Sequence, residues 1–424
     1  MLQAYRYLTY FLYPLLIILI YLRSIFNKED KIRFKEKIFS SHFNAYNNNN
    51  KLIWFHAASI GECLSIIPLI EEINNNNNNN KINFLITTVT LSSSRLLESK
   101  LNQHHNTVHR FLPLDLENLA EKFLDLWKPD VVCFVDSEIW PNFLFKIKEK
   151  KIPLLLINAR LTKKSFNKWK VVLNFAKKVF NNFDLCLAAS EESKKNLSKF
   201  EVKNLKYIGN LKYSIQNKLD KIQEPNKKKL NNYNTWCAAS THVGEELIVL
   251  KAHIEIKKKY DNCLTIIVPR HINRSSRIKN LSKKLNLNSQ ILNDNDIIRS
   301  NTEILIINSF GVLPKYFNYC KNIFIGKSFI KSKKNVSGQN PIEAAKFGCK
   351  IFHGPYVYNF QEIYGYLKSY GITEKVNNEI ELAEKIIENF KNPIIKNHQQ
   401  INLLNNYGEK ILKETVLELK VYLK

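Results

Sequence analysis

The strongest constraint on the fold is an alternation of short apolar runs with helical patterns that occurs twice along the chain. In the first half, a predicted strand at 52–55 ends in a Ser-Ile-Gly turn and precedes a helix that runs to about residue 73. In the second half, a predicted strand at 235–239 leads into a helix at 244–256. Strands that alternate with helices are typical of parallel sheets covered on both faces. The sequence therefore predicts two α/β units.

The two halves also share a local sequence. Residues 57–62 read Ala-Ala-Ser-Ile-Gly-Glu, and residues 238–245 begin Ala-Ala-Ser and end Gly-Glu. Each copy falls where a predicted strand ends and a helix begins, and the free N–H groups of a helix amino terminus favour anions. Two such units that face one another form a cleft between the ends of their strands, so we expect ligands there.

Further apolar runs extend both halves. The predicted strands of the first half are 52–55, 83–87, 131–135, 153–158 and 185–189, and the last of these closes that half. Those of the second half are 235–239, 264–269, 304–307, 322–325 and 350–353. The polar stretch 214–234 lacks apolar periodicity and is the expected linker, and 286–301 is expected to be a loop.

The amino terminus carries an uncharged, mostly apolar segment at 7–22, followed by a basic flank at 23–37. The segment is slightly shorter than the roughly 20 residues that span a bilayer, but residues 1–6 add length with only Arg6 charged. No small-residue cleavage site follows, which disfavours a removable signal peptide. A buried helix of a soluble domain is the alternative. We interpret the segment as a membrane anchor, and the basic flank predicts that the rest of the chain lies on the cytoplasmic side.

The formal net charge of +26 has several interpretations. The chain is rich in Lys, Asn and Ile, so a compositional bias that places lysine on a solvated surface explains part of the charge. The remaining interpretations are an anionic membrane surface, an anionic substrate or a nucleic acid. With 45% hydrophobic residues, a wholly disordered basic protein is excluded.

The cysteines indicate a reducing compartment. There are seven, and no two of them form a Cys-x-x-Cys pair. This spacing argues against both an extracellular disulfide scaffold and a cysteine-based zinc site.

Several clusters are too dense in polar residues to be explained by packing, and nearly all of these clusters fall just after a predicted strand, where a doubly wound sheet binds its ligands. In chain order they are HAASIGE at 56–62, DSEIWPN at 136–142, NAR at 158–160, GNLK at 209–212, STH at 240–242, PRHINR at 269–274 and GQNPIE at 338–343, and HGP follows at 353–355. Their order and spacing resemble those of the 3-deoxy-D-manno-octulosonic acid (Kdo) transferases of lipopolysaccharide assembly. The resemblance covers almost the whole chain.

The resemblance implies an α/β protein of the GT-B fold, with two Rossmann-like domains facing across a cleft and an N-terminal membrane-anchor helix. The implied organisation is an anchor with its basic flank at 1–40, an acceptor-binding domain at 41–213, a linker at 214–234, and a CMP-sugar-binding domain with closing C-terminal helices at 235–424.

The implied activity is inverting transfer of Kdo from CMP-Kdo onto a lipid A precursor (lipid IVA). The implied location is the bacterial inner membrane, with a single N-terminal anchor and the catalytic domains in the cytoplasm. The expected partners are the two substrates and anionic membrane lipids, without nucleic acid. No cofactor and no metal are expected, so Lys and Arg side chains would neutralise the phosphate.

Three residues are the expected catalytic groups. A sugar hydroxyl needs a base to become a nucleophile, and Glu62, at a helix start, matches the base proposed for the family. Its competing interpretation is a capping carboxylate of that helix. Lys212 matches a residue that stabilises the transition state, and Glu138 is expected to orient the acceptor or steady the oxocarbenium-like centre.

The expected CMP-binding residues lie in the second half. They are Pro269, Arg270, Phe310, Gly311, Val312, Asn340, Pro341, Ile342 and Glu343. Arg274 is expected to assist Arg270. This sequence has Phe-Gly-Val at 310–312 where the family has Met-Gly-Glu, and Lys327 interrupts a second glycine-rich stretch.

Other classes of function stay open on the residues alone. Within the enzymes, another membrane-associated GT-B transferase that uses a UDP-sugar, and a hydrolase with Glu62 and Glu138 as paired carboxylates, are the alternatives. The only Asp-x-Asp sequence, at 294–296, is a weak candidate for a metal site. Among non-enzymes, the alternatives are a basic nucleic-acid-binding or membrane-binding protein and a non-catalytic membrane scaffold.

Overall fold

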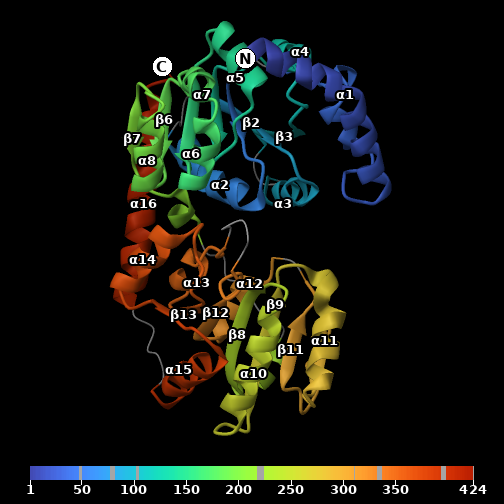
Figure 1. Ribbon diagram of the computed structural model, residues 1–424, viewed down its shortest axis with the longest axis vertical. Helices are drawn as coiled ribbons and strands as arrows, with labels where there is room; N and C mark the ends of the chain where they lie inside the picture. The colour runs from blue at the N-terminus through green and yellow to red at the C-terminus, as the bar shows by residue number, and fades with distance from the viewer. Residues whose placement is uncertain are drawn as a thin grey trace. The chain divides into compact units, whose positions relative to one another are not determined.

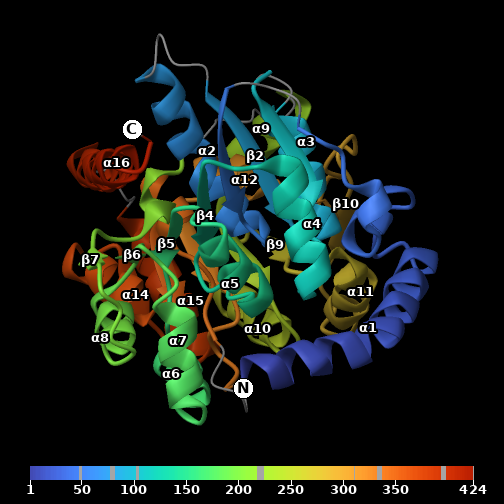
Figure 2. The same ribbon diagram turned by 90° about the horizontal axis from the view of Figure 1, so that it is seen from above.

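The computed structural model describes residues 1–46, 50–76, 82–101, 105–216, 224–309, 311–331, 337–392 and 398–423. These residues form two compact units, shown in Figures 1 and 2. The first unit is Met1–Ile215 together with Asn406–Lys424, and the second is Gln216–Asn405. The second unit is therefore inserted into the first. The sequence had placed all of 235–424 in one domain, whereas the chain from Asn406 onward groups with the first unit.

The first unit is built on a seven-stranded sheet in the order β3-β2-β1-β4-β5-β6-β7, and its paired strands are all parallel. Its strands are β1 (Lys51–His56), β2 (Ile82–Thr88), β3 (Thr107–Phe111), β4 (Val131–Val135), β5 (Leu154–Ala159), β6 (Leu185–Ala188) and β7 (Leu205–Tyr207). Its helices are α1 (Leu2–Ile25), α2 (Ile60–Asn75), α3 (Leu91–Leu101), α4 (Glu117–Trp127), α5 (Pro141–Glu149), α6 (Lys163–Lys170), α7 (Leu173–Phe180) and α8 (Glu191–Ser198).

The second unit repeats the parallel plan with a sheet in the order β10-β11-β9-β8-β12-β13-β14. Its strands are β8 (Asn234–Thr241), β9 (Cys263–Pro269), β10 (Ser289–Leu292), β11 (Ile304–Ile307), β12 (Asn322–Ile325), β13 (Lys350–His353) and β14 (Thr373–Lys375). Its helices are α9 (Glu224–Asn231), α10 (Glu245–Lys257), α11 (Ser275–Lys284), α12 (Leu313–Tyr319), α13 (Ile342–Lys346), α14 (Gln361–Ser369) and α15 (Glu379–Lys391), and α16 (His398–Lys420) passes from this unit back to the first.

Each sheet reverses its strand order at one place. In the first sheet, β1 pairs with β2 on one side and with β4 on the other. In the second sheet, β8 takes the same place between β9 and β12. The crevice at such a reversal, beyond the carboxyl ends of the strands, is where doubly wound sheets bind ligands. The loops after β1 and β4, and after β8 and β12, therefore mark one candidate site in each unit.

Every strand expected from an apolar run is present, but four further strands were missed. The expected loop at 286–301 contains β10, and β7 follows the strand that was expected to close the first half. The other two are β3 and β14. The missed strands β3, β7, β10 and β14 are the two edge strands of each sheet, and they carry polar side chains because an edge is only partly covered.

Helix α1 packs lengthwise on the first unit rather than standing free of it. Its inner face buries Ile20 against Phe34 and Ile38, and the Tyr13 hydroxyl donates to the Ile38 carbonyl oxygen at 2.6 Å. The outer face is apolar and exposed, and it consists of Tyr7, Leu8, Tyr10, Phe11, Leu15, Ile18, Leu19, Leu22 and Ile25. Within the part of the chain that the structure describes, α1 is the one helix that is both long enough and apolar enough to cross a membrane.

The basic flank after α1 is only partly free to meet an anionic surface. Lys37 is buried in an ion pair with Glu29, which also pairs with Arg23. Arg33 pairs with Glu36 and with Glu98. Lys28 and Lys31 are exposed. About half of the basic side chains of the flank therefore form ion pairs within the first unit.

Candidate functional site

Glu62 lies at the amino terminus of α2, at the candidate site where the strand order reverses between β1 and β4. Its Oε1 accepts a hydrogen bond from the Ser59 hydroxyl at 2.6 Å, and its Oε2 accepts one from the Ala58 N–H at 2.8 Å. Ser59 in turn caps α2 by accepting from the Glu62 N–H. This reciprocal arrangement is a variant of the capping box, in which the carboxylate accepts from the N–H of Ala58 rather than from that of the capping residue Ser59. The capping interpretation of Glu62 is thus confirmed, and it leaves room for a second role.

The environment of Glu62 suits that second role. Burial raises the pKa of Glu62 to about 7, although the Ser59 hydrogen bond opposes the rise. The negative charges of Asp136 and Glu138 raise this pKa further. A carboxylate with a pKa near the working pH is an effective general base, because it is both substantially deprotonated and basic enough to take a proton.

Glu138 lies in the loop after β4, on the other side of the same crevice. The Trp140 indole N–H donates to Glu138 Oε2 at 2.9 Å. The buried His56 places its Nε2 atom 3.5 Å from the same oxygen, and its Nδ1 contacts the Thr87 hydroxyl at 2.9 Å. The carboxylate is therefore held by the Trp140 indole and lies close to His56, while a fifth of its side chain stays exposed.

Lys212 joins the cluster through Asp136, the first residue of the polar cluster at 136–142. Its Nζ donates to Asp136 Oδ2 at 3.1 Å, and both side chains are largely buried. Asn158 positions the Lys212 loop, because its Oδ1 accepts from the Leu211 N–H at 2.9 Å. Asp136 and Asn158 both have left-handed backbones at the ends of their strands, with φ of 62° and 51°. Three carboxylates and one ammonium group thus meet in the first unit.

The second unit gathers basic side chains at its own crevice. The Arg270 side chain is exposed directly after β9, and the backbone N–H of Arg270 donates to the Thr241 carbonyl oxygen at 3.1 Å. Burial lowers the pKa of His242 to about 4, and the positive charges of Lys327, His271 and Arg270 lower it further. Lys327 has a left-handed backbone, with φ of 58°. These groups are suited to an anionic ligand. Arg274 is not free to assist, because it forms a two-point ion pair with Glu246.

One buried carboxylate holds the loops of this crevice together. Glu245 accepts hydrogen bonds from the N–H groups of Lys327, Ser328 and Phe329, at 2.6, 2.7 and 3.0 Å, and from that of His242 at 2.9 Å. Gly326 lies so close to the β8 loop that a Cβ atom there would fall 2.6 Å from the Ser240 carbonyl oxygen. Glu62 and Glu245 therefore have corresponding positions in the two units, but the fully buried Glu245 has no access to a ligand.

The remaining expected nucleotide residues lie in two segments of the second unit. Asn340 Oδ1 accepts from the Ile342 N–H at 3.2 Å, and Pro341 precedes the short helix α13. Burial raises the pKa of Glu343 to about 7. Gly311 is left-handed with open space around it, Val312 is buried at the start of α12, and Pro269 ends β9. Phe310 lies outside the described residues.

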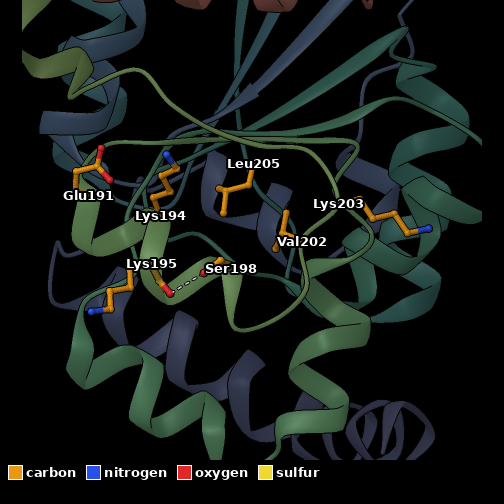
Figure 3. Close-up of a pocket in the computed structure, with 7 residues that line it drawn as sticks. All are labelled: Glu191, Lys194, Lys195, Ser198, Val202, Lys203 and Leu205. Atoms are coloured by element: carbon orange, nitrogen blue, oxygen red, sulfur yellow. Dashed lines mark hydrogen bonds between the residues drawn. The ribbon is translucent and has the colours of Figure 1, made fainter.

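The larger of two hollows in the first unit lies away from these clusters. It measures about 450 Å³ and is lined by Glu191, Lys194, Lys195, Ser198, Val202, Lys203 and Leu205. Figure 3 shows the ammonium ends of Lys195 and Lys203 pointing away from one another, so they do not converge on a ligand. A smaller hollow of about 20 Å³ touches Asp136, Ser137 and Arg160 beside the crevice.

The described residues hold no cluster of three or more His, Cys, Asp or Glu side chains that suits a metal ion. In the Asp-x-Asp sequence, Asp296 accepts hydrogen bonds from the N–H and the side-chain amide of Asn293. Asp294 is exposed. The Asp-x-Asp sequence therefore lies in a polar loop in which Asp296 is bonded to Asn293.

Two parallel seven-stranded sheets, each with ligand-type side chains at its strand reversal, define a GT-B type α/β protein. The fold matches that of the UDP-GlcNAc 2-epimerase from Neisseria meningitidis, with a TM-score of 0.57 at 16% identity over 87% of this chain and 99% of that one. Residues 33–215 match the family model of the 3-deoxy-D-manno-octulosonic-acid transferases (kdotransferases).

Comparison of whole sequences identifies the family. The chain is 30% identical to the 3-deoxy-D-manno-octulosonic acid transferase of Rickettsia bellii over 98% of both chains. It is 27% identical to that of Haemophilus influenzae over 95% of this chain and 92% of that one. The chain belongs to the Kdo transferase family, and it is a glycosyltransferase of lipopolysaccharide synthesis.

Proposed function

We propose that this Kdo transferase moves Kdo from CMP-Kdo onto a lipid A precursor with inversion at the anomeric carbon and without a metal. The observation that carries the proposal is Glu62, a buried carboxylate whose pKa is raised and which is close to Glu138 and to Asp136, the ion-pair partner of Lys212. In the reaction, Glu62 takes the proton of an acceptor hydroxyl. The oxygen then attacks the anomeric carbon, and the bond to CMP breaks.

The basic groups supply what a metal supplies in other transferases. Arg270 and Lys327 are suited to the phosphate of CMP, whose negative charge grows as the bond to Kdo breaks. Interactions that strengthen as this charge develops lower the barrier. In the first unit, Lys212 stabilises charge near the acceptor, and Glu138 steadies the cationic character of the sugar.

The apolar outer face of α1 supports attachment to the inner membrane, with the catalytic units in the cytoplasm. The acceptor is a lipid, so a membrane-bound enzyme meets it where it resides. Exposed aromatic and aliphatic side chains on one helix face, with Lys28 and Lys31 beyond its end, favour an anionic bilayer surface.

The test is a transfer assay with the full-length protein, a lipid A precursor and either CMP-Kdo or UDP-sugars, in which the mass of the product is measured. We expect addition of Kdo from CMP-Kdo alone, in the presence of a chelator. Use of a UDP-sugar would contradict the proposed donor, and loss of activity with the chelator would contradict the metal-free mechanism.

A substitution tests the base. Glu62→Gln preserves the capping box, since glutamine also serves at that position, but it cannot accept the proton. We expect transfer to be abolished while CMP binding survives. Glu72→Gln, near the end of the same helix, is the matched control and should transfer normally. Normal transfer by Glu62→Gln would refute the assignment.

A further inference from the structure

One buried carboxylate joins α1 to the segment that carries Glu138. Asp115 lies between β3 and α4 and is 6% exposed. Its Oδ2 accepts from the Tyr5 hydroxyl of α1 at 2.7 Å and from the Asn142 N–H at 3.1 Å. Its Oδ1 accepts from the Phe143 N–H at 3.0 Å. Asp115 therefore receives one hydrogen bond from α1 and two from the first turn of α5.

These contacts make Asp115 the cap of α5. The residue at the capping position, Trp140, has no side-chain hydrogen bond to the helix, and Pro141 follows it. Asp115 supplies the missing acceptor and places a negative charge at the helix amino terminus, which is favourable there. Its carbonyl oxygen also accepts from the Asn142 side-chain amide at 2.6 Å. The start of α5 is thus fixed by a residue from another loop.

The start of α5 in turn determines where Glu138 lies. Trp140 donates its indole N–H to Glu138 Oε2 at 2.9 Å, and this is the oxygen nearest His56 Nε2. A shift of the first turn of α5 moves Trp140, and with it the carboxylate beside Glu62.

Helix α1 contacts α5 at both of its ends. Thr9 Oγ1 accepts from the Asn142 side-chain amide at 3.5 Å, and Arg6 pairs with Glu149 at 3.5 Å. Arg6 also pairs with Glu117, at the start of α4, at 2.9 Å. The amino-terminal half of α1 therefore contacts both α4 and α5.

We infer that Asp115 is a positioning residue through which α1, by way of Tyr5, holds Glu138 in its working position. The position of Glu138 therefore depends on whether α1 is packed against the first unit. The kinetic consequence rests on the proposed function, but the structural coupling does not.

A fluorine signal on Trp140 tests the coupling without any assay of transfer. The full-length protein contains five tryptophans, so labelling with 5-fluorotryptophan gives few signals, and Trp140→Phe assigns the one from Trp140. We expect Tyr5→Phe, which removes only the hydroxyl, and Asp115→Asn to shift the Trp140 signal but not the signal of Trp236 in the second unit. Tyr7→Phe, on the exposed face of the same helix, is the matched control and should shift neither.

An unchanged Trp140 signal in Tyr5→Phe would overturn the inference, and so would equal shifts of all the tryptophan signals. In the transfer assay, we expect Tyr5→Phe to lower kcat about tenfold, as the loss of a hydrogen bond to a charged group allows, with KM for the donor unchanged. Unchanged kcat would also overturn it. If the wild-type protein transfers no Kdo, the proposed function fails and the fluorine result still decides the inference.

Discussion

Glu62 combines a role in the fold with the role of base that we propose for it. Its two oxygens complete a capping box with Ser59 and Ala58, so its position is fixed before any substrate binds. The same burial that orders the side chain also raises its pKa to about 7. A preorganised base needs both properties, because a mobile or strongly acidic carboxylate would take up the acceptor proton less well.

The raised pKa predicts a pH dependence. The base is competent only when deprotonated, so kcat/KM should rise with pH and level off above the pKa of about 7 of the free enzyme. The measurement is initial rates at low substrate between pH 5 and pH 9. A profile that is already flat at pH 5 would contradict the assignment of Glu62 as the base.

The pair of Lys212 and Asp136 predicts an asymmetry between single and double substitutions. Lys212→Met leaves Asp136 buried without its charge partner, which costs about 3–5 kcal/mol. Adding Asp136→Asn removes the unpaired charge, so we expect the double variant to regain most of the free energy of unfolding, as measured with urea, while transfer stays impaired. Restored transfer in the double variant would contradict the role of Lys212.

At this scale, Glu62, Glu138 and Arg270 were predicted as neighbours of ligands because each follows a predicted strand, whereas Lys212 was predicted from the resemblance of its motif alone. The sequence could not predict that Asp136 pairs with Lys212, which is 76 residues away along the chain. Nor could it show that Arg274 is occupied by Glu246. Such pairings depend on which strands become neighbours in the sheet.

At the scale of elements, the buried strands were predictable and the edges were not. β4 and β11 are continuous apolar runs because both faces of their sheets are covered. The edge strand β14, by contrast, reads Thr-Glu-Lys and carries no apolar signal. The loops that form the second crevice were recognised by their motifs, but their close packing around Glu245 required the structure.

That close packing predicts opposite effects for two glycine substitutions in the second unit. Gly326→Ala would place its Cβ atom 2.6 Å from the Ser240 carbonyl oxygen and 2.7 Å from the Thr241 Cα, so it should destabilise by about 1–3 kcal/mol. Gly365→Ala, exposed within α14 with no heavy atom nearby, should stabilise by about 0.5–1 kcal/mol. Thermal unfolding measures both, and equal effects would contradict the packing.

At the scale of the whole molecule, the two α/β units were predictable from the repeated plan, but the end of the second was not. The last helix gave no sign in the sequence that it returns to the first unit. It does so through specific contacts: Gly408 packs against the Tyr213 backbone, and Lys206 pairs with Glu418 at 2.7 Å.

The outer face of α1 predicts how the molecule binds a bilayer. Phe11→Asp with Ile18→Asp places two charges on that face, where the wild-type side chains are 83% and 56% exposed. We expect co-sedimentation with anionic vesicles to weaken by about tenfold for each apolar side chain lost. Ile380→Asp, an exposed position in the second unit, should bind as the wild type does. Unchanged binding of the double variant would show that α1 is not the lipid contact.

The return of α16 has a consequence for the order in which the protein matures. The first unit begins at residue 1 but needs Ile411, Val416 and Leu419 to complete its buried surface. A ribosome must therefore finish the entire chain before the unit that it began first can close. During that interval the inserted second unit can already fold, and the unit that carries Glu62 is completed last.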